Sequence, residues 1–439
     1  MIWHMTNRSI NGTINVPGDK SITHRALIFS AFSQGKSVVR NISPALDCVN
    51  SALCLQELGM TMRLFPGGTE SGGFCEIETE GPQALHPALK TLDAGNSGTT
   101  IRLLSGLCAG LPHSTLFDGD ESLRRRPMAR VLSYLEQMGA KVEYVGEANY
   151  PPFKIQGGEL IGKHFTLPVA SAQVQTAILL AGLFAQGQTS VSTPTLVRDH
   201  TARMFSYLGI SHEMPDEFTL CVNSLSQPVK PFEYTVAADI SSAAFFMVAA
   251  SILPGSQVML PQVGINPGRR LVIDALWRMG ASIELMNERL LCNEPVADIQ
   301  VTYTGDLKGI TISGDVIAAG IDEIPALALA AAFSHGEFVV EGAEELKVKE
   351  SNRLNAIVDN LSKAGADIKA TEDGFVLVGK GALKGGDIWK SHGDHRMAMT
   401  GLVADLACLE PVAVDNTDCI GISYPDFIDD LAKLTVHRV

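Results

Sequence analysis

The chain repeats one pattern six times, and this internal period restricts its fold more than any other feature. An apolar, helix-like run ends at a glycine or a similar break, and a strand-like segment follows it. The six copies are SAFSQGKSVVRNI, LCAGLPHSTLFDG, LFAQGQTSVSTP, SILPGSQVMLPQV, AAFSHGEFVVEGA and LACLEPVAVDN. Their breaks lie roughly 70–80 residues apart, a period longer than those of common solenoids.

A second helix–strand pair falls between successive breaks. It is seen in LCLQELGMTMRL, VLSYLEQMGAKVEYV, ARMFSYLGISHEM, IDALWRMGASIEL and IVDNLSKAGADIKA, where helical spacing runs into a glycine suited to a helix C-terminus. Each repeat is therefore predicted to be an α/β module of two helices and several strands. Helix–glycine–strand patterns occur in any α/β protein, but six recurrences in phase favour a true repeat. A chain of 439 residues exceeds one ordinary core, so six modules predict two similar domains of three.

Every repeated helix is predicted to begin with a polar cluster. The clusters are GDKSITHR, GNSGTTIR, ASAQVQT, DISSAAFF, IDEIPAL and GDHRMAM. Serine, aspartate and asparagine in them could simply be N-caps. Capping does not account for the additional side chains Lys20, Arg25, Arg102, Gln173, His395 and Arg396. Because helix N-termini attract anions, we expect these ends to form an anion-binding site.

Three further stretches, GDESLRRRPM, VRDHTARM and ELKVKESNRL, bring cations. The triplet Arg124, Arg125 and Arg126 precedes a proline that could start a helix, although an arginine triplet is more often solvated surface. Lys349 and Arg353 are four residues apart and would share a face if their segment is helical. Guanidinium groups recognise carboxylate and phosphate in a bidentate manner, so a doubly anionic substrate would suit such a set.

Other classes of function lack support in the sequence. A formal charge of −14 argues against a nucleic-acid partner. There is no GxxxxGK[ST], no GxGxxG opening a βαβ unit and no GxSxG. No spacing resembles a metal site, and the pair Asp394–His395 is interpreted as a hydrogen-bonded polar cluster. The eight cysteines show no paired spacing and are expected to be buried thiols in a reduced compartment.

Asp322 and Glu350 are the best candidates for acid–base chemistry. Each lies in a polar island between apolar runs, close in sequence to cations or to a helix start. Asp322 could alternatively be only the N-cap of the helix IPALALAAAF.

Taken together, these motifs resemble the EPSP synthase family, the shikimate-3-phosphate carboxyvinyltransferases. PGDKSITHR, GNSGTTIRL, GDESLRRRPM, SAQVQTAILLAG, RDHTARM, DISSAAFF, DEIPALALA, KVKESNRL and GDHRMAM carry the resemblance over essentially the whole chain. SAQVQ, RDHTARM and DISSAAFF are similar to the second bacterial class of the family.

The resemblance implies an α/β fold of two similar domains, each of three repeated units, with the active site in the cleft between them. One domain would comprise residues 1–18 and 235–439, and the other residues 19–234. It implies transfer of the enolpyruvyl group of phosphoenolpyruvate to the 5-hydroxyl of shikimate-3-phosphate, with release of phosphate. No metal or organic cofactor would be needed.

The same resemblance assigns site residues, and several of them serve more than one role. The residues expected to bind shikimate-3-phosphate are Lys20, Ser21, Arg25, Ser171, Ala172, Gln173, Arg198, Asp322 and Lys349. Those expected to bind phosphoenolpyruvate are Lys20, Asn96, Gly98, Arg126, Gln173, Arg353 and Arg396. The catalytic residues would be Asp322 as the base for the attacking hydroxyl, and Glu350, with Lys20, for protonation of the methylene carbon.

The chain departs from the family pattern at two places. Many relatives have a lysine before the aromatic–proline pair near the C-terminus, where this chain has Ile422 and Ser423, and we assign no cation there. Glu345 occupies a position where some relatives have asparagine. Gly98 is the residue type whose replacement by alanine narrows the phosphoenolpyruvate pocket in the family, so we expect ordinary sensitivity to glyphosate.

Two other functions compete with this interpretation. The related enolpyruvyltransferase that acts on UDP-N-acetylglucosamine has a catalytic cysteine on a mobile loop and an early Lys-Asn pair. Here the early pair is Lys20-Ser21, and the comparable loop GDESLRRRPM has no cysteine. A non-catalytic protein that binds phosphometabolites would not need both Asp322 and Glu350. The start of the chain has no signal-peptide core, so we expect a cytoplasmic monomer without nucleic-acid or membrane partners.

Overall fold

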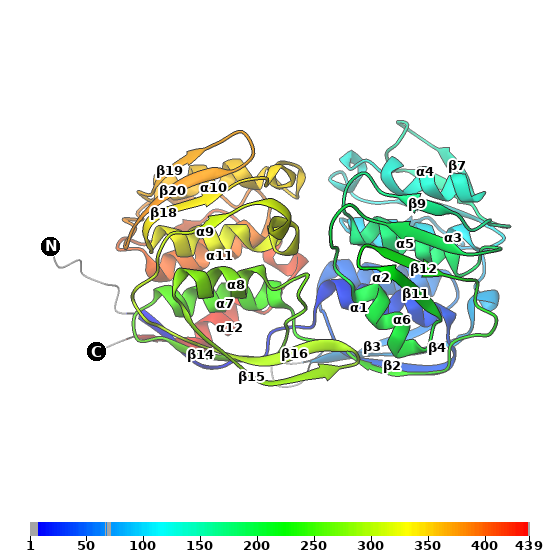
Figure 1. Cartoon of the computed structure of the whole chain (residues 1–439), viewed down its shortest axis with the longest axis horizontal. Helices are drawn as coiled ribbons and strands as arrows, with labels where there is room; N and C mark the ends of the chain where they lie inside the picture. Colours follow the sequence, from blue (N-terminus) through cyan, green and yellow to red (C-terminus); the bar gives the residue numbers. More distant parts are fainter. Residues whose placement is uncertain (1–7, 66, 68–71, 438–439) are drawn as a thin grey trace. The chain divides into compact units, whose positions relative to one another are not determined.

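The computed structural model describes residues 8–65, 67 and 72–437. The chain forms two compact units (Figure 1). Unit 1 comprises Met1–Pro17, Ala237–Leu290 and Pro295–Val439, and unit 2 comprises Gly18–Val236 and Leu291–Glu294. Leu291–Glu294 is the turn of a hairpin whose strands continue in unit 1, so the chain passes between the units four times.

Each unit contains three pairs of α-helices in its described part, as the sixfold period predicts. The helices of unit 2 are α1 (Lys20–Phe29), α2 (Leu46–Glu57), α3 (Gly98–Ala109), α4 (Ala129–Met138), α5 (Ala172–Gly182) and α6 (His200–Leu208). The helices of unit 1 are α7 (Ile240–Ile252), α8 (Leu271–Met279), α9 (Ile324–Ala332), α10 (Arg353–Lys363), α11 (His395–Ala407) and α12 (Phe427–Leu434). The six predicted polar clusters lie at the starts of the odd-numbered helices, which confirms the repeat.

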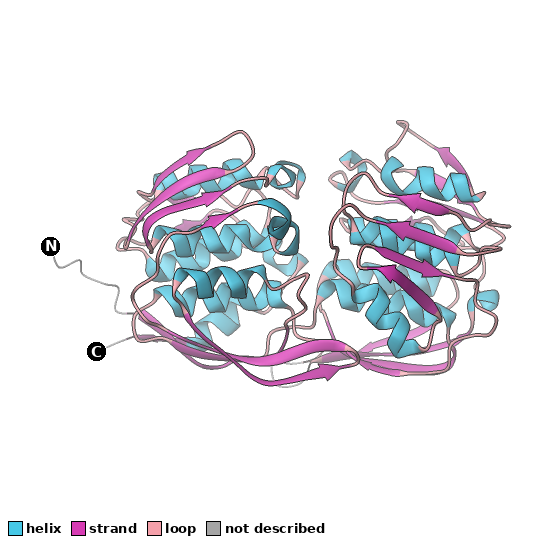
Figure 2. Ribbon diagram, in the orientation of Figure 1, coloured by secondary structure: helices cyan, strands magenta, loops and turns pink. Residues whose placement is uncertain are grey.

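Small sheets surround the helices of each unit (Figure 2). In unit 2 the strand orders are β13 (Glu233–Thr235), β2 (Gln34–Ile42), β4 (Gly73–Glu80), β3 (Thr61–Phe65); β5 (Leu92–Asp93), β6 (Ser114–Asp118), β8 (Phe153–Gln156), β7 (Lys141–Tyr144); and β11 (His212–Asp216), β12 (Thr219–Val222), β10 (Thr189–Ser192), β9 (His164–Thr166). In unit 1 they are β17 (Thr311–Ile312), β18 (His335–Val340), β20 (Phe375–Lys380), β19 (Asp367–Ala370); β15 (Ser282–Leu291), β16 (Glu294–Thr302), β14 (Gln257–Gly264), β1 (Arg8–Thr13), β23 (Thr435–His437); and β21 (Ile388–Trp389), β22 (Ala413–Val414).

One connection recurs in the four-stranded sheets. The strand that follows the first helix of a module pairs antiparallel with the last strand of the hairpin that follows the second helix. In the second module β6 and β8 pair in this way, with Ser114 opposite Gln156, while β5 runs parallel to β6. The last strand of a βαβαββ module therefore pairs with the module's own second strand, and this closes each repeat locally.

The odd-numbered helices of unit 1 form its core. All residues of α7 and α9 are buried, because these helices are apolar on every side. They pack against each other and against α11 (Figure 1). The glycines predicted at the C-termini of the second helices follow the even-numbered helices α2 to α10. Gly209, for example, follows α6 in the left-handed region at φ 71°, a conformation that costs glycine little.

Two local expectations differ from the structure. Helix α4 begins at Ala129 rather than at Pro127, with Met128 as its N-cap, and Arg126 before the proline is extended (ψ 126°). Lys349 and Arg353 do not share one helix: a 3₁₀ turn spans Glu344–Val348, and α10 starts afresh at Arg353 with Asn352 as its N-cap.

The thiols behave as predicted. All eight cysteines are free and only Cys292 is partly exposed. Burial raises the pKa of Cys108 to about 12, so this thiol stays protonated and unreactive. Among the described residues, no helix has the length and apolar character needed to cross a bilayer.

Candidate active site

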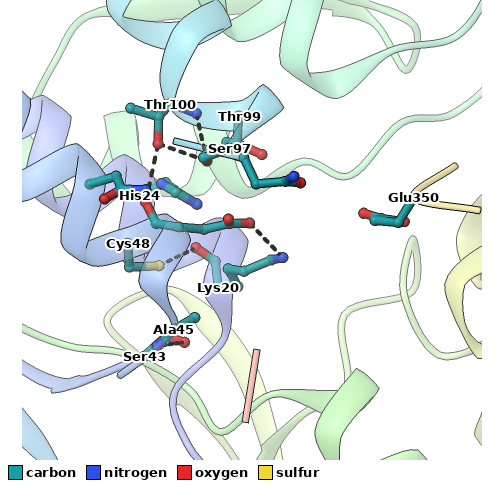
Figure 3. Close-up of polar contacts among 12 residues, drawn as sticks. Lys20, His24, Ser43, Ala45, Cys48, Ser97, Thr99, Thr100 and Glu350 are labelled. Atoms are coloured by element: carbon teal, nitrogen blue, oxygen red, sulfur yellow. Dashed lines mark hydrogen bonds and ion pairs between the residues drawn. The ribbon is translucent and has the colours of Figure 1, made fainter. Parts of the chain in front are cut away.

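Lys20 is the first residue of α1 in unit 2 and carries the charge that capping alone does not explain. Asp19 caps the helix, because its carboxylate accepts the N–H of Ile22. The Lys20 ammonium lies 2.8 Å from Oδ2 of Asp47 in the first turn of α2 (Figure 3). The pair is only partly buried, so the ammonium is held in place and remains accessible to a ligand.

Arg25, one turn further along α1, is almost completely buried. Its Nε donates to the Thr201 hydroxyl at 2.9 Å, and its Nη2 donates to the Thr176 hydroxyl at 2.9 Å. Its Nη1 donates to the carbonyl of Ser21 at 3.0 Å. The pKa of Arg25 is lowered to about 10, mainly by burial; the charge of Asp19 acts against this, and the charge of Arg198 adds to it. The guanidinium is therefore positively charged but hydrogen-bonded to neutral groups.

Three predicted residues lie close together at the N-terminus of α3: Asn96, Gly98 and Arg126. Nη2 of Arg126 donates to Oδ1 of Asn96 at 2.9 Å, and Nδ2 of Asn96 donates to Asp120 at 2.7 Å. A Cβ placed on Gly98 would lie 2.8 Å from Nη1 of Arg102 and 3.5 Å from Nη1 of Arg126. Two guanidinium groups thus flank the bare Cα of Gly98, in front of a helix N-terminus.

Gln173 joins the start of α5 to α3. Nη1 of Arg102 donates to Oε1 of Gln173 at 2.7 Å, and Nε2 of Gln173 donates to the Thr99 hydroxyl at 2.9 Å. Ser171 caps α5, and the carbonyl of Ala172 accepts a long bond from Arg25. Unit 2 therefore brings its predicted residues together in smaller groups: Asn96 with Arg126 at the start of α3, and Arg25 with the backbone carbonyls of Ser21 and Ala172.

In unit 1, Asp322 is the centre of the predicted set. Its carboxylate lies 3.5 Å from Nζ of Lys349 and 3.1 Å from Nη1 of Arg353. The alternative role of Asp322 as a helix cap is wrong, because Glu323 precedes α9 and no side chain caps it. Two cations beside a carboxylate favour its charged form, which is the form that accepts a proton.

Arg353 is buried and lies among three carboxylates. Besides Asp322, it contacts Glu350 at 2.5 Å and Asp394 at 2.7 Å. Burial by itself lowers the pKa of Arg353, but its three anionic partners together raise the pKa above the usual value. Burial likewise opposes ionisation of Asp394, yet the charges of Arg353 and His395 and the hydrogen bond from Arg353 together lower the pKa of Asp394.

Arg396, in the first turn of α11, completes the set. Its Nη1 donates to the backbone carbonyl of Asp322 at 3.2 Å and lies 3.6 Å from Oε1 of the buried Glu323. All predicted residues of unit 1 therefore lie within one network around Asp322.

Sequence reasoning missed the carboxylates that hold these cations. Asp47 lies 27 residues from Lys20, and Asp394 lies 41 residues from Arg353. Asp394 stands in a motif that had been recognised, but only its tertiary contact shows its partner. Of the arginine triplet, Arg124 and Arg125 are exposed and pair with nearby acids, as surface residues do.

A metal site finds no support within the described part of the chain. No group of three or more histidine, cysteine, aspartate or glutamate side chains there is arranged to hold an ion.

Comparison with known proteins gives one consistent family. The family model for EPSP synthase (3-phosphoshikimate 1-carboxyvinyltransferase) matches residues 5–431. A 3-phosphoshikimate 1-carboxyvinyltransferase of Bacillus cereus (strain B4264) is 43% identical over 430 residues, covering 98% of this chain and 97% of its own. The same-named protein of Brevibacillus brevis is 42% identical, with 98% of both chains covered.

Solved structures agree with these sequences. EPSP synthase from Acinetobacter baumannii superimposes with a TM-score of 0.88 at 38% identity, covering 98% of this chain and 96% of that one. The enolpyruvyl transferase NikO from Streptomyces tendae has a TM-score of 0.78 at 16% identity, covering 99% and 97%, and shares the fold.

Proposed function

Since the chain belongs to the EPSP synthase family, we propose that it transfers the carboxyvinyl group of phosphoenolpyruvate to the 5-hydroxyl of shikimate-3-phosphate and releases phosphate. The observation that supports these substrates is the grouping of the expected residues in each unit: cations and amides in unit 2, and a base among cations in unit 1. Both substrates carry a phosphate and a carboxylate, so the reaction needs several cations.

Shikimate-3-phosphate would be bound mainly by residues of unit 2. Arg25 is suited to its phosphate, because the guanidinium has a full charge and only neutral partners. Arg198 adds a second positive charge close enough to affect Arg25. The remaining ligands on this unit are Lys20, Ser21, Ser171, Ala172 and Gln173, and unit 1 would add Asp322 and Lys349.

Phosphoenolpyruvate would be bound at the start of α3. Asn96 and Arg126 already contact each other there, and Gly98 leaves space beside Arg126 for an anionic group. Lys20 and Gln173 complete the site on unit 2, and Arg353 and Arg396 contribute from unit 1. Glyphosate, an inhibitor of the family, would compete at this site.

Asp322 would act as the base in the addition step. It removes the proton of the 5-hydroxyl as that oxygen bonds to C2 of phosphoenolpyruvate, while Glu350, with Lys20, delivers a proton to the methylene carbon C3. The tetrahedral intermediate then loses a proton from C3 and its C2–O bond to phosphate breaks, with the same groups in reversed roles. All atoms are accounted for without a cofactor.

Glu350 must exchange a partner before it can donate a proton. Its contact with Arg353 favours the carboxylate form. An anionic substrate that binds Arg353 would weaken this contact and allow Glu350 to carry the proton. Binding of phosphoenolpyruvate would thus prepare the acid for the step that follows.

The first experiment measures phosphate release from phosphoenolpyruvate alone, with shikimate-3-phosphate and with UDP-N-acetylglucosamine. Release only with shikimate-3-phosphate is expected. Release only with the nucleotide sugar would overturn the acceptor, and tight binding of shikimate-3-phosphate without release would overturn the catalysis.

The roles of the two carboxylates are tested by single-turnover measurements on Asp322→Asn and Glu350→Gln. Both rates should fall by at least about 100-fold, the usual scale of a lost general acid or base. Glu372→Gln, an exposed carboxylate on a turn, is the matched control and should retain the wild-type rate. A wild-type rate in either test variant would remove that residue from the mechanism.

A further inference from the structure

His24 is a completely buried side chain that the proposed reaction does not use. It lies on α1, one turn beyond Lys20, and its Nδ1 is 2.8 Å from the hydroxyl of Ser51 on α2. Ser51 in turn lies 2.8 Å from the hydroxyl of Thr100 on α3. Three helices of unit 2 are thus joined by a chain of neutral polar groups.

Two adjacent pairs of contacting side chains, called rungs below, join α1 to α2. Lys20 and His24 are four residues apart on α1, and their partners Asp47 and Ser51 are four residues apart on α2. Residues with this spacing lie on one face of a helix. The rung from Lys20 to Asp47 is ionic and partly exposed, whereas the rung from His24 to Ser51 is neutral and fully buried. The buried rung fixes the register in which the exposed one forms.

The direction of the hydrogen bonds follows from the hydroxyl of Thr100. It has one hydrogen, which has two good acceptors: Oγ of Ser97 at 2.7 Å and the carbonyl of Asp47 at 3.1 Å. Ser97 already acts as an acceptor there, because it caps α3 by accepting the N–H of Thr100. With its hydrogen directed to either of these, Thr100 accepts from Ser51 at 2.8 Å, and Ser51 is the donor.

This direction of the hydrogen bonds determines the tautomer of His24. Since the single hydrogen of Ser51 is directed to Thr100, Ser51 must accept from His24, and Nδ1 of His24 must carry the proton. Burial lowers the pKa of His24 to about 3, with smaller effects of opposite sign from Asp47 and Lys20, so the ring is neutral at assay pH and Nε2 is bare. Within the described residues Nε2 has no hydrogen-bond partner, and a buried acceptor tolerates this better than a buried donor.

We infer that His24, as the neutral Nδ1–H tautomer, is a positioning residue for carboxyvinyl transfer: it donates along the chain Ser51–Thr100 and thereby holds Lys20 and the start of α3 in register, an inference that rests on the proposed function. Thr100 lies two residues after Gly98, and Asp47 contributes both its carbonyl to Thr100 and its carboxylate to Lys20. The same small cluster therefore aligns the lysine of α1 with the anion site of α3.

Two substitutions of His24 separate this role from simple packing. The amide of asparagine can place an N–H near the position of Nδ1, whereas the amide of glutamine reaches the position of Nε2. His24→Asn should retain kcat/KM for phosphoenolpyruvate within about threefold, and His24→Gln should lose about tenfold or more, because small displacements of catalytic groups are costly. Equal losses in both variants would overturn the inference.

A smaller substitution in the same chain of hydrogen bonds tests the inference in case the His24 variants do not fold. Ser51→Ala removes only the middle hydroxyl and should lower kcat/KM about tenfold. Ser105→Ala is its matched control, since Ser105 is also a buried serine but bonds only to the carbonyl of Ile101 in its own helix. The same rate in both serine variants would overturn the inference.

A direct measurement does not depend on activity. Histidine-selective ¹⁵N NMR of the wild-type chain, with His24→Asn used to assign the signal, should show a protonated Nδ1 and a bare Nε2 at neutral pH. A protonated Nε2 would overturn the inference even in an active enzyme. Absence of phosphate release by the wild type would instead overturn the proposed function, so the two failures are distinguishable.

Discussion

Replacing Gly98 by alanine should weaken the binding of phosphoenolpyruvate without weakening the fold. The new Cβ would lie 2.8 Å from Nη1 of Arg102, well inside ordinary van der Waals contact. Arg102 is not free to swing away, because the same Nη1 donates to Gln173 at 2.7 Å. The substitution therefore either displaces the guanidinium or breaks its bond to Gln173.

The size of the effect follows from Gln173, an expected ligand of phosphoenolpyruvate that a displaced Arg102 would shift. A hydrogen bond to a charged group contributes about 1.5–3 kcal/mol, and a shift of some tenths of an ångström forfeits part of it. A loss of about 1.4 kcal/mol corresponds to a tenfold change in affinity. We therefore expect the KM for phosphoenolpyruvate to rise about tenfold in Gly98→Ala, and inhibition by glyphosate to weaken.

Steady-state kinetics and a thermal melt together test this reasoning. Alanine is favoured over glycine within a helix by up to about 1 kcal/mol, which offsets the cost of moving Arg102, so the melting temperature should change little. Gly146→Ala is the matched control, since its Cβ would meet only Pro152, at 3.8 Å. An unchanged KM for phosphoenolpyruvate in Gly98→Ala would refute the reasoning, and a lowered melting temperature would point to damage of the fold instead.

Three further predictions concern unit 1, unit 2 and the inhibitor. Arg353→Met leaves the buried Asp394 without its cation, and urea unfolding should show a loss of about 3–5 kcal/mol; a loss below about 1 kcal/mol would contradict the ion-pair argument. The pKa of His24, about 3 in the fold against about 6.5 unfolded, means that only the unfolded chain takes up a proton between these values. Stability should therefore be full above pH 6.5 and fall towards pH 3 by up to about 5 kcal/mol, and urea titrations of His24→Asn should lack this component. Glyphosate should inhibit the wild type in competition with phosphoenolpyruvate, and little inhibition at concentrations that saturate sensitive relatives would count against an open Gly98 pocket.

The sequence predicts the helix starts well because their signals are local. Asp19, Ser97 and Ser171 each cap the helix that follows within their own polar cluster. The prediction that Pro127 starts a helix is wrong by two residues, since α4 begins at Ala129 with Met128 as its N-cap.

Partners of the charged groups are harder to predict because they come from tertiary packing. No local spacing connects Lys20 to Asp47 or Arg353 to Asp394. The i,i+4 relation proposed for Lys349 and Arg353 fails as helix geometry, yet both side chains reach Asp322. Sequence reasoning thus named residues that lie together around Asp322, but it did not predict the contact that unites them.

The two buried arginines show how similar motifs can serve different chemistry. Arg25 is surrounded by hydroxyls and carbonyls, and burial lowers its pKa to about 10, so its charge lacks an anionic partner in direct contact. Arg353 has three carboxylates, and its pKa is raised. An anionic ligand would therefore stabilise Arg25 directly, whereas at Arg353 it must displace a carboxylate. The first arrangement suits substrate binding, and the second couples binding at Arg353 to the charge of Glu350, which is the coupling that acid catalysis requires.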